Sequence, residues 1–334
     1  MGVVITNDDR DVLLTEDLSA DYYKKMMHSP TIVEESHAYE NAFGVARMQV
    51  YHFDGISLVC CNADTYENIH ILADQIEPRV GMLFMEQGHI VTSVEGVCKK
   101  HSFSSLEHNL LFSPHEFESA AVKKQRDINF FGLSFSTDRF LELADNNGRV
   151  LDKLANRVAG NKPVSLNEKF NLPMTIQMQR VIADIKRCPF KGPIKKLFLQ
   201  SKALELLALQ CDQLENNVLM EEVPVGKLSA QDLEKLYHAR DLMIMNMQEP
   251  FTLAQLSRKV GLNEFKLKSG FKAVFNNTVY GYLNDHRLET AREMILVGKY
   301  NMSEIAETAG YSSPQHFSTA FKKKYGVSPI QIRK

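Results

Sequence analysis

The side chains most able to do covalent or redox chemistry in this sequence are its cysteines. Cys60 and Cys61 are adjacent, whereas Cys98, Cys188 and Cys211 stand far apart, so there is no CxxC pair to hold zinc or act as a dithiol. Adjacent cysteines form only a strained disulfide, and a free cysteine is most often a core residue. Redox sensing by Cys60 and Cys61 is therefore a secondary alternative.

Metal binding is the next chemistry, because His101, Glu107, His108 and His115 fall within one segment. A metal-binding barrel of the cupin kind needs two closely spaced histidines, and the sequence contains no HxH. The spacings between these four residues also do not set three ligands on one strand face. The sequence has no phosphate-binding loop, dinucleotide fingerprint or recognisable nucleophile. We expect no metal, no other cofactor and no enzyme activity.

Lysine and arginine, which bind phosphates, are unevenly distributed. The 334 residues carry a net charge of −2, but residues 229–334 hold 15 Lys and Arg against 10 Asp and Glu, or +5. The residues before them hold 24 against 31, or −7. A basic part on an acidic body is typical of a tethered nucleic-acid module, because cations release counterions at phosphates. Chance variation along a chain is an equal alternative at this charge.

Length and hydropathy indicate how the chain is organised. We expect two main domains, no membrane association and a reduced, cytoplasmic location. No apolar run approaches the roughly 18 to 20 residues of a bilayer span, and the start, MGVVITNDDRDVLL, turns acidic too early for a signal peptide. The expected divisions are a β-rich N-terminal domain, a helical segment, a linker and a basic C-terminal domain: residues 1–172, 173–216, 217–228 and 229–334.

Short β-branched and aromatic runs dominate the sequence up to about Val158. They are broken by Gly, Asp and Pro and comprise residues 48–61, 79–96, 108–122 and 127–136. This pattern favours a small antiparallel barrel or sandwich.

The period becomes helical in residues 174–187 and again in 194–214. Apolar residues at intervals of seven, three, four and three form one seam on the second helix: Leu197, Leu204, Leu207, Cys211 and Leu214. The seam either packs on the barrel of its own chain or forms a homodimer contact.

The C-terminal third contains an approximate internal repeat. Its copies are FTLAQLSRKVGLNEFKLKSGFKAVF, residues 251–275, and NMSEIAETAGYSSPQHFSTAFKKKY, residues 301–325. The matched positions are the apolar ones and a glycine, at an offset of 49 and then 50: Leu256 with Ile305, Val260 with Ala309, Gly261 with Gly310, Leu267 with Phe317, Phe271 with Phe321 and Phe275 with Tyr325.

Each copy predicts two short helices joined by a glycine turn, which is a helix-turn-helix unit. The expected caps are Thr252 with Gln255 and Ser303 with Ala306 for the first helices, and Asn263 and Ser312 or Ser313 for the second. The second helix of such a unit enters the major groove.

Residues 278–300 predict a longer helix between the copies, with Tyr282, Leu283, Leu288, Ala291, Ile295 and Leu296 available for burial. It would hold the two units about 34 Å apart, one turn of B-DNA.

About the last 100 residues resemble the AraC/XylS family of bacterial transcription regulators. The motifs are LAQLSRKVGLNEFKLKSGFK, YLNDHRLETAREMIL and MSEIAETAGYSSPQHFSTAFKKKYGVSPIQIR, of which the last is highly specific through GVSP. The resemblance implies a bipartite domain that inserts two helices into successive major-groove segments, usually to activate transcription with RNA polymerase. It also implies an α+β chain, in which a cupin-like barrel and dimerising helices precede an all-α domain of two helix-turn-helix units joined by a long helix.

The resemblance also implies which residues contact double-stranded DNA. Base contacts are Phe265, Lys268 and Ser269 in the first unit, and Pro314, Gln315, Ser318 and Thr319 in the second, with His316 beside them. The amide of Gln315 can pair bidentately with adenine. Phosphate contacts are Lys266, Lys272, Lys322, Lys323 and Lys324. For each of these lysines the alternative is a solvated side chain at a helix end without a role in binding DNA.

Two residues depart from the family pattern. Ser269 stands where the family often has Arg, and Gly270 costs about 1 kcal/mol in a helix interior, so readout by the first unit is expected to be weaker or more selective.

We therefore expect a sequence-specific transcription regulator, acting as an activator, whose N-terminal domain binds a small-molecule effector or a partner. The alternative is a dimeric DNA-binding regulator whose N-terminal domain takes no ligand. The sequence does not name the residues of an effector pocket.

Overall fold

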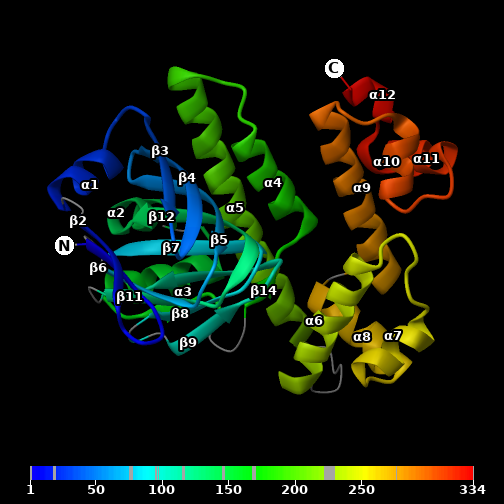
Figure 1. The fold of residues 1–334 in the computed structure, drawn as a ribbon, viewed down its shortest axis with the longest axis horizontal. Helices are drawn as coiled ribbons and strands as arrows, with labels where there is room; N and C mark the ends of the chain where they lie inside the picture. Colours follow the sequence, from blue (N-terminus) through cyan, green and yellow to red (C-terminus); the bar gives the residue numbers. More distant parts are fainter. Residues whose placement is uncertain are drawn as a thin grey trace. The chain divides into compact units, whose positions relative to one another are not determined.

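The computed structural model describes residues 2–17, 20–74, 78–94, 96, 98–114, 117–144, 147–167, 171–221, 230–275 and 277–333. The chain divides into an N-terminal unit, Met1–Glu215, and a C-terminal unit, Asn216–Lys334 (Figure 1). The predicted linker, residues 217–228, is helical as far as Glu221, and the rest of it lies outside the described residues.

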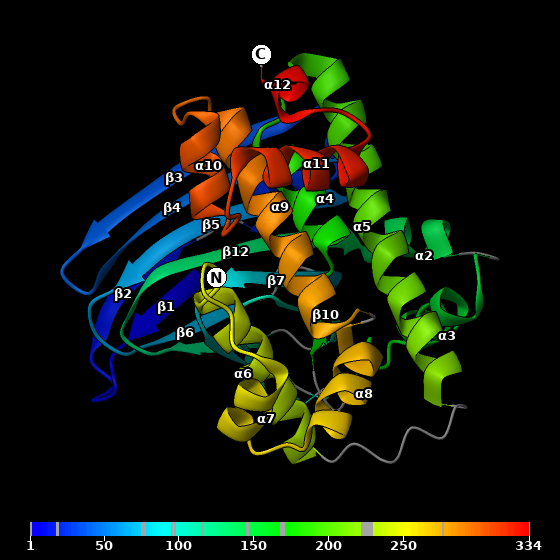
Figure 2. The ribbon, with the colours of Figure 1, turned by 90° about the vertical axis from the view of Figure 1, so that its right-hand side faces the viewer.

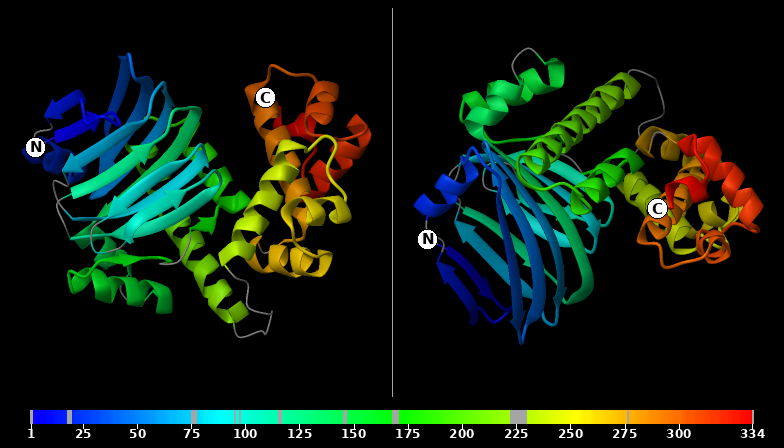
Figure 3. Two further views of the ribbon diagram at one scale, coloured as in Figure 1. Left: turned by 60° about the horizontal axis from the view of Figure 1, so that its bottom comes forward. Right: turned by 90° about the horizontal axis from the view of Figure 1, so that it is seen from above.

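Two antiparallel sheets form most of the N-terminal unit (Figure 3). The first has the order β2 (Val12–Asp17), β1 (Gly2–Thr6), β6 (Ile69–Asp74), β11 (Phe117–Val122), β8 (Ile90–Val94) and β9 (Cys98–Phe103). The second has the order β13 (Val164–Ser165), β10 (Glu107–Phe112), β7 (Arg79–Gln87), β12 (Gln125–Ser136), β5 (Ile56–Thr65), β4 (Gly44–Phe53) and β3 (Val33–Asn41), with β14 (Leu172–Pro173) also on β10. The predicted strands are thus confirmed in type.

The strand pairing is nested along the chain. In the second sheet β5 pairs with β12 and β7 with β10, while in the first β6 pairs with β11 and β8 with β9. One core draws residues from both sheets and therefore lies between them; it includes Ile69, Met85, Ile90, Phe103 and Val122. The other face of each strand is left for further packing.

Three short helices interrupt the β-rich region: α1 (Ala20–Met27), α2 (Thr137–Ala144) and α3 (Arg149–Ala159). The prediction of strands and turns up to Val158 was therefore wrong for α1, α2 and α3. In α3 the buried residues Val150, Leu154 and Val158 are spaced four apart, which is a helical period. Helices this short leave a weak signal in the sequence.

Helices α4 (Ile176–Lys186) and α5 (Gly192–Glu221) pack on the second sheet instead of forming a separate body. Their apolar residues, among them Met178, Ile182 and Leu206, share one core with Phe84, Phe131 and Leu133 of the sheet. The two helices predicted for residues 174–187 and 194–214 are present as α4 and α5, but they belong to the same unit as the sheets.

Seven helices are described in the C-terminal unit: α6 (Ala230–Met245), α7 (Leu253–Val260), α8 (Glu264–Phe275), α9 (Val279–Val297), α10 (Met302–Thr308), α11 (Pro314–Tyr325) and α12 (Pro329–Ile332). Helix α9 extends from the group α6–α8 to the group α10–α12 (Figure 2). Among the helices that the structure describes, none combines the length and apolar content of a membrane span.

Candidate nucleic-acid interface

The first helix pair has the predicted caps and turn. The backbone N–H of Thr252 donates to the Gln255 side chain at 2.9 Å, and the Thr252 hydroxyl accepts from the Gln255 N–H, which closes a capping box at the start of α7. Gly261 ends α7 with φ 68°, in the left-handed region. Asn263 then caps α8 by accepting from the Lys266 N–H at 2.7 Å.

The second helix pair begins at a different residue from the one predicted. The carboxamide of Asn301 accepts from the N–H groups of Ser303 and Glu304, both at 2.9 Å, and the Glu304 carboxylate accepts from the Asn301 N–H. The cap is therefore Asn301 with Glu304, and the prediction of Ser303 with Ala306 was wrong, because this capping box forms two residues earlier.

The turn of the second pair agrees with the prediction. Gly310 adopts φ 74°, as its match Gly261 does at φ 68°. Ser313 caps α11 by accepting from the N–H of His316, and Pro314 occupies the first helical position, where no N–H is needed.

Helix α9 contributes to both cores of the C-terminal unit. Tyr282 and Leu283 pack in the core that holds Leu267 and Phe271 of α8. Its later residues pack in the core that holds Phe317 and Phe321 of α11: Leu288, Ala291 and Ile295. The burial predicted for Leu296 was wrong. The neighbouring Ile295 points into the core, whereas Leu296 lies on the outer face of α9 and is 43% exposed.

Polar side chains of α9 also hold the second helix pair. Asn284 accepts from the Tyr311 hydroxyl at 2.8 Å, and burial raises the pKa of Tyr311 to about 12, so the phenol keeps its proton. Glu289 accepts from the Tyr325 hydroxyl at 2.9 Å. Asn284 and Glu289 in the run YLNDHRLETAREMIL therefore have a structural use.

The predicted base-contacting residues of α8 lie on its outer surface. Phe265 is 82% exposed, and Lys268 is exposed with a weak ion pair to Glu264 at 3.6 Å. The Ser269 hydroxyl donates to the Phe265 carbonyl, so its proton is already used inside the helix.

The predicted base-contacting residues of α11 differ in exposure and in the hydrogen bonds that they already make. Gln315 is exposed, and no described residue bonds its carboxamide. The Thr319 hydroxyl donates to the Gln315 carbonyl at 3.0 Å, while Pro314 and Ser318 are half-buried. Gln315 thus presents an open side-chain amide that could reach a base edge.

Two of the five predicted phosphate contacts have carboxylate partners. Lys266 Nζ lies 2.7 Å from Asp232 Oδ2, and its side chain is still 40% exposed. Lys324 pairs with Asp285 of α9 and is only 17% exposed, which favours a role in holding α11 on α9, and its phosphate contact stays a prediction. The other three, Lys272, Lys322 and Lys323, are exposed.

Helix α6 was not singled out by the sequence. Its Arg240 is fully buried, pairs with Asp241 at 2.7 Å and lies over the ring of Tyr237. The apolar positions Leu236, Ala239 and Met243 were the available signal, since their spacing is helical.

The cysteine alternative receives no support from the environment of Cys60 and Cys61. Both thiols are free and buried, and they point to opposite faces of β5 because they are adjacent on a strand. Burial raises the pKa of Cys60 to about 11 and that of Cys61 to about 12, which disfavours the reactive thiolate.

His108, one of the candidate metal ligands, is occupied by helix α5. Its Nδ1 accepts from Gln210 Nε2 at 2.8 Å, and its Nε2 donates to Gln213 Oε1 at 2.8 Å. His101 bonds Asn171, and His115 lies outside the described residues. Within the described parts of the chain, no three His, Cys, Asp or Glu residues are grouped to hold a metal.

The predicted dimerisation seam is divided between the core and the surface. Leu207 and Cys211 are buried in the core shared with the sheet, so packing on the same chain accounts for them. Leu204 and Leu214 are half-buried, and Leu197 is 65% exposed. A dimer contact stays a prediction for Leu197.

Solved structures similar to this chain include DNA-binding domains and longer regulators. An AraC-type regulator from Chromobacterium violaceum is 27% identical and covers 31% of this chain and 94% of that chain, with a TM-score of 0.29. An apo form of a ToxT variant from Vibrio cholerae is 13% identical and covers 83% and 96%, with a TM-score of 0.34.

Curated relatives match parts of their own lengths. The regulatory protein PchR of Pseudomonas aeruginosa is 37% identical over 148 residues, which are 44% of this chain and 48% of PchR. ArgR of the same organism is 29% identical over 113 residues, 34% of each protein. The chain thus spans about half the length of PchR and a third of that of ArgR.

Two family models together cover most of the chain. The model of the regulatory protein PchR N-terminal domain matches residues 44–224, more than half of the sequence. A helix-turn-helix domain model matches residues 256–334, which hold most of α7 and all of α8–α12. The chain therefore belongs to the AraC/XylS family of transcriptional regulators, with an N-terminal domain of the PchR type.

Proposed function

We propose that this protein is a sequence-specific regulator that places α8 and α11 in successive major-groove segments of double-stranded DNA and activates transcription. The observation that carries the proposal is the use of α9 in both cores, because one rigid helix then supports both recognition helices. A unit of this kind reads a bipartite site.

The proposed contacts follow from exposure and from the partners already present. The exposed residues proposed to contact bases are Phe265 and Lys268 of α8 and Gln315 and Thr319 of α11, with the half-buried Ser269, Pro314 and Ser318 beside them. Phosphate contacts are assigned to Lys272, Lys322 and Lys323, while Lys266 would have to leave or share Asp232.

Selection of bound sequences from random duplex DNA with the full chain tests this function. Two enriched blocks, separated by about one helical turn, are the expected result. No enriched sequence would refute specific recognition, and a single short block would refute the bipartite assignment.

The N-terminal unit is proposed to be the regulatory domain, built on a cupin-like double-sheet barrel. The nested pairing of β5–β12, β6–β11, β7–β10 and β8–β9 supports that architecture. An effector that binds one arrangement of this domain more tightly would shift the population of DNA-binding states.

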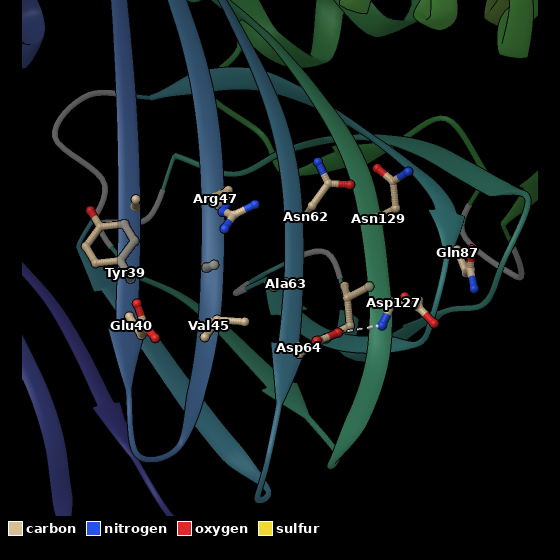
Figure 4. Close-up of a pocket in the computed structure, with 13 residues that line it drawn as sticks. Tyr39, Glu40, Val45, Arg47, Asn62, Ala63, Asp64, Gln87, Asp127 and Asn129 are labelled. Atoms are coloured by element: carbon tan, nitrogen blue, oxygen red, sulfur yellow. Dashed lines mark hydrogen bonds between the residues drawn. The ribbon is translucent and has the colours of Figure 1, made fainter. Parts of the chain in front are cut away.

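A groove of about 570 Å³ on the second sheet is the proposed effector site (Figure 4). The strand register pairs Arg47 with Asn62, Asn62 with Asn129 and Asn129 with Gln87, so a guanidinium and three amides form one row across four strands. Asp64 lies two residues along β5 from Asn62, on the same face. These groups suit a small polar ligand.

The alternative function is regulation without a ligand, in which the N-terminal unit only associates with itself or with another protein. Heating the full chain with a panel of polar metabolites separates the two. A ligand site predicts a raised Tm with some compound, lost in Arg47→Ala and kept in Arg126→Ala, which removes an exposed cation outside the groove. No raised Tm with any compound favours the alternative.

Homodimer formation and contact with RNA polymerase complete the proposal. The exposed Leu197 at the start of α5 supports a dimer contact, which light scattering of the wild type and Leu197→Glu tests. A monomeric wild type would refute it.

A further inference from the structure

A cationic groove lies on helix α3 of the N-terminal unit, away from the strands that form the effector groove. Its volume is about 700 Å³. Four cations and two other polar residues line it: Arg149, Lys153, Arg157 and Lys162, with Asp152 and Asn156. No apolar side chain is among these residues.

The geometry of α3 places the cations in one stripe. Arg149, Lys153 and Arg157 follow each other at four-residue intervals, which puts them on one helix face about 6 Å apart along the axis. Arg157 donates to the Pro163 carbonyl at 2.6 Å, and this bond folds the following turn back so that Lys162 joins the groove.

These cations have no carboxylate partner among the described residues, although the chain before residue 229 carries a net charge of −7. Other lysines of the same unit do form ion pairs: Lys186 with Glu86, Lys195 with Glu34 and Lys196 with Asp54. Among the described residues, the groove therefore holds four cations against the single carboxylate of Asp152, which is a net positive surface on an acidic unit.

Helix stability does not account for the stripe. Arg157 and Lys162 lie at the C-terminal end of α3, where cations interact favourably with the helix dipole. Arg149 is the first residue of α3, at the positive end, and it repels Lys153 one turn later. Both interactions are unfavourable, and Asp152 in the first turn offsets only one of the four positive charges, so an external anion would stabilise the stripe.

We propose that this stripe binds phosphate groups of the DNA backbone next to the site that α8 and α11 read, an inference that depends on the proposed DNA-binding function. Repeated cations without an apolar centre suit a polyanion better than a protein surface, whose contact area has an apolar core. The N-terminal unit would then add sequence-independent affinity to the specific contacts of the C-terminal unit.

The test compares two duplexes with the full chain: a short one that holds only the selected site, and a long one extended on both sides by unrelated sequence. The stripe variant is Arg149→Ala/Lys153→Ala/Lys162→Ala, which leaves the Arg157 bond intact. On the long duplex its plot of log K against log salt should be shallower by roughly 3, since each phosphate contact contributes about 0.9. On the short duplex it should match the wild type.

Two further variants control for charge and folding. Lys123→Ala/Lys124→Ala/Arg126→Ala removes the same charge from exposed positions between β11 and β12 and in β12, and should behave as the wild type on both duplexes. Arg149→Lys/Lys153→Arg/Lys162→Arg keeps the charge and should keep the salt slope.

Three results would overturn the inference. They are an unchanged slope for the stripe variant on the long duplex, an equal loss in the Lys123 control, and an equal loss on the short duplex. A wild type that binds neither duplex refutes the proposed function itself and the inference with it, whereas tight binding to the short duplex separates the two.

Discussion

The guanidinium of Arg287, on helix α9, donates through Nε to the carbonyl oxygen of Met247 at 2.9 Å. Met247 belongs to the segment between α6 and α7, in the first helix pair's half of the unit. The same guanidinium lies 5.9 Å from the ring centre of Tyr311, which follows the turn of the second pair. One arginine thus joins the two halves of the DNA-binding unit.

Replacing Arg287 should weaken the connection between the halves. In Arg287→Met the Met247 carbonyl loses its donors, and we expect a loss of about 1–3 kcal/mol in unfolding free energy, measured by urea denaturation of the full chain. Arg287→Lys should recover only part of this loss, because an ammonium cannot make the same forked contact. A change below about 0.5 kcal/mol would contradict the role assigned to Arg287.

Gly310 should tolerate no side chain, for two separate reasons. Its φ of 74° is strained for other residues, and a Cβ would lie 2.5 Å from the Met247 carbonyl. Gly326 has a similar φ of 76° but no atom within 4 Å of its Cβ position, so Gly326→Ala measures the strain alone. We expect Gly310→Ala to lower the Tm clearly more than Gly326→Ala does, and equal effects would show that the close approach is relaxed.

Lys323 and Lys324 are adjacent and should differ in kind. Lys323→Met should weaken binding to all DNA sequences and reduce the salt slope by about 0.9, with little change in stability. Lys324→Met breaks the pair with Asp285 and should cost about 1–2 kcal/mol of unfolding free energy. Binding assays and denaturation of both variants check this, and matching profiles would remove the distinction.

Gln315 should determine the preference for one base pair. Its exposed carboxamide can make two hydrogen bonds to adenine, so Gln315→Ala should reduce discrimination at one position by about 1–3 kcal/mol. Competition between the selected site and its single-base variants measures this, with Lys323→Ala as the variant that weakens every sequence alike. Equal losses on specific and random DNA for Gln315→Ala would refute the assignment.

Acid should destabilise the N-terminal unit through His108. Burial lowers the pKa of His108 from 6.5 to about 4, so the unfolded chain takes up the proton first as the pH falls. The contribution of neutral His108 to the free energy of unfolding is therefore complete above about pH 6.5. It decreases towards pH 4 by on the order of 3 kcal/mol. His108→Gln should be less stable at neutral pH but should show a flatter pH dependence, whereas an unchanged slope would show that other groups titrate.

His286, on α9, should act in the same direction within the C-terminal unit, since burial lowers its pKa to about 4 as well. Comparing His108→Gln with the wild type by the unfolding transition of the N-terminal unit separates the two histidines.

The C-terminal unit could be predicted closely because its determinants are local. Caps such as Thr252, the turn glycines, and apolar residues at helical spacing act over a few residues, and they predicted both helix pairs and most of the burial on α9. The cap at Asn301 was missed because Ser303, two residues later, is an equally plausible N-cap in the sequence.

Long-range partners were the part that the sequence could not supply. The seam of α5 has the same spacing whether it packs on a sheet or on a second copy, and the structure places Leu207 and Cys211 on the sheet. The bonds of His108 with Gln210 and Gln213 join residues more than 100 positions apart. In the sequence Lys324 cannot be distinguished from Lys322 and Lys323, because its partner Asp285 lies 39 positions earlier in the chain.

Hydroxyl-radical footprinting of the full chain on its selected duplex tests the central claim most directly. Two protected backbone segments on one face of the DNA, about one helical turn apart, are predicted, one of which weakens in Lys268→Ala and the other in Gln315→Ala. A single protected segment, or loss of the same segment in both variants, would contradict recognition by both α8 and α11.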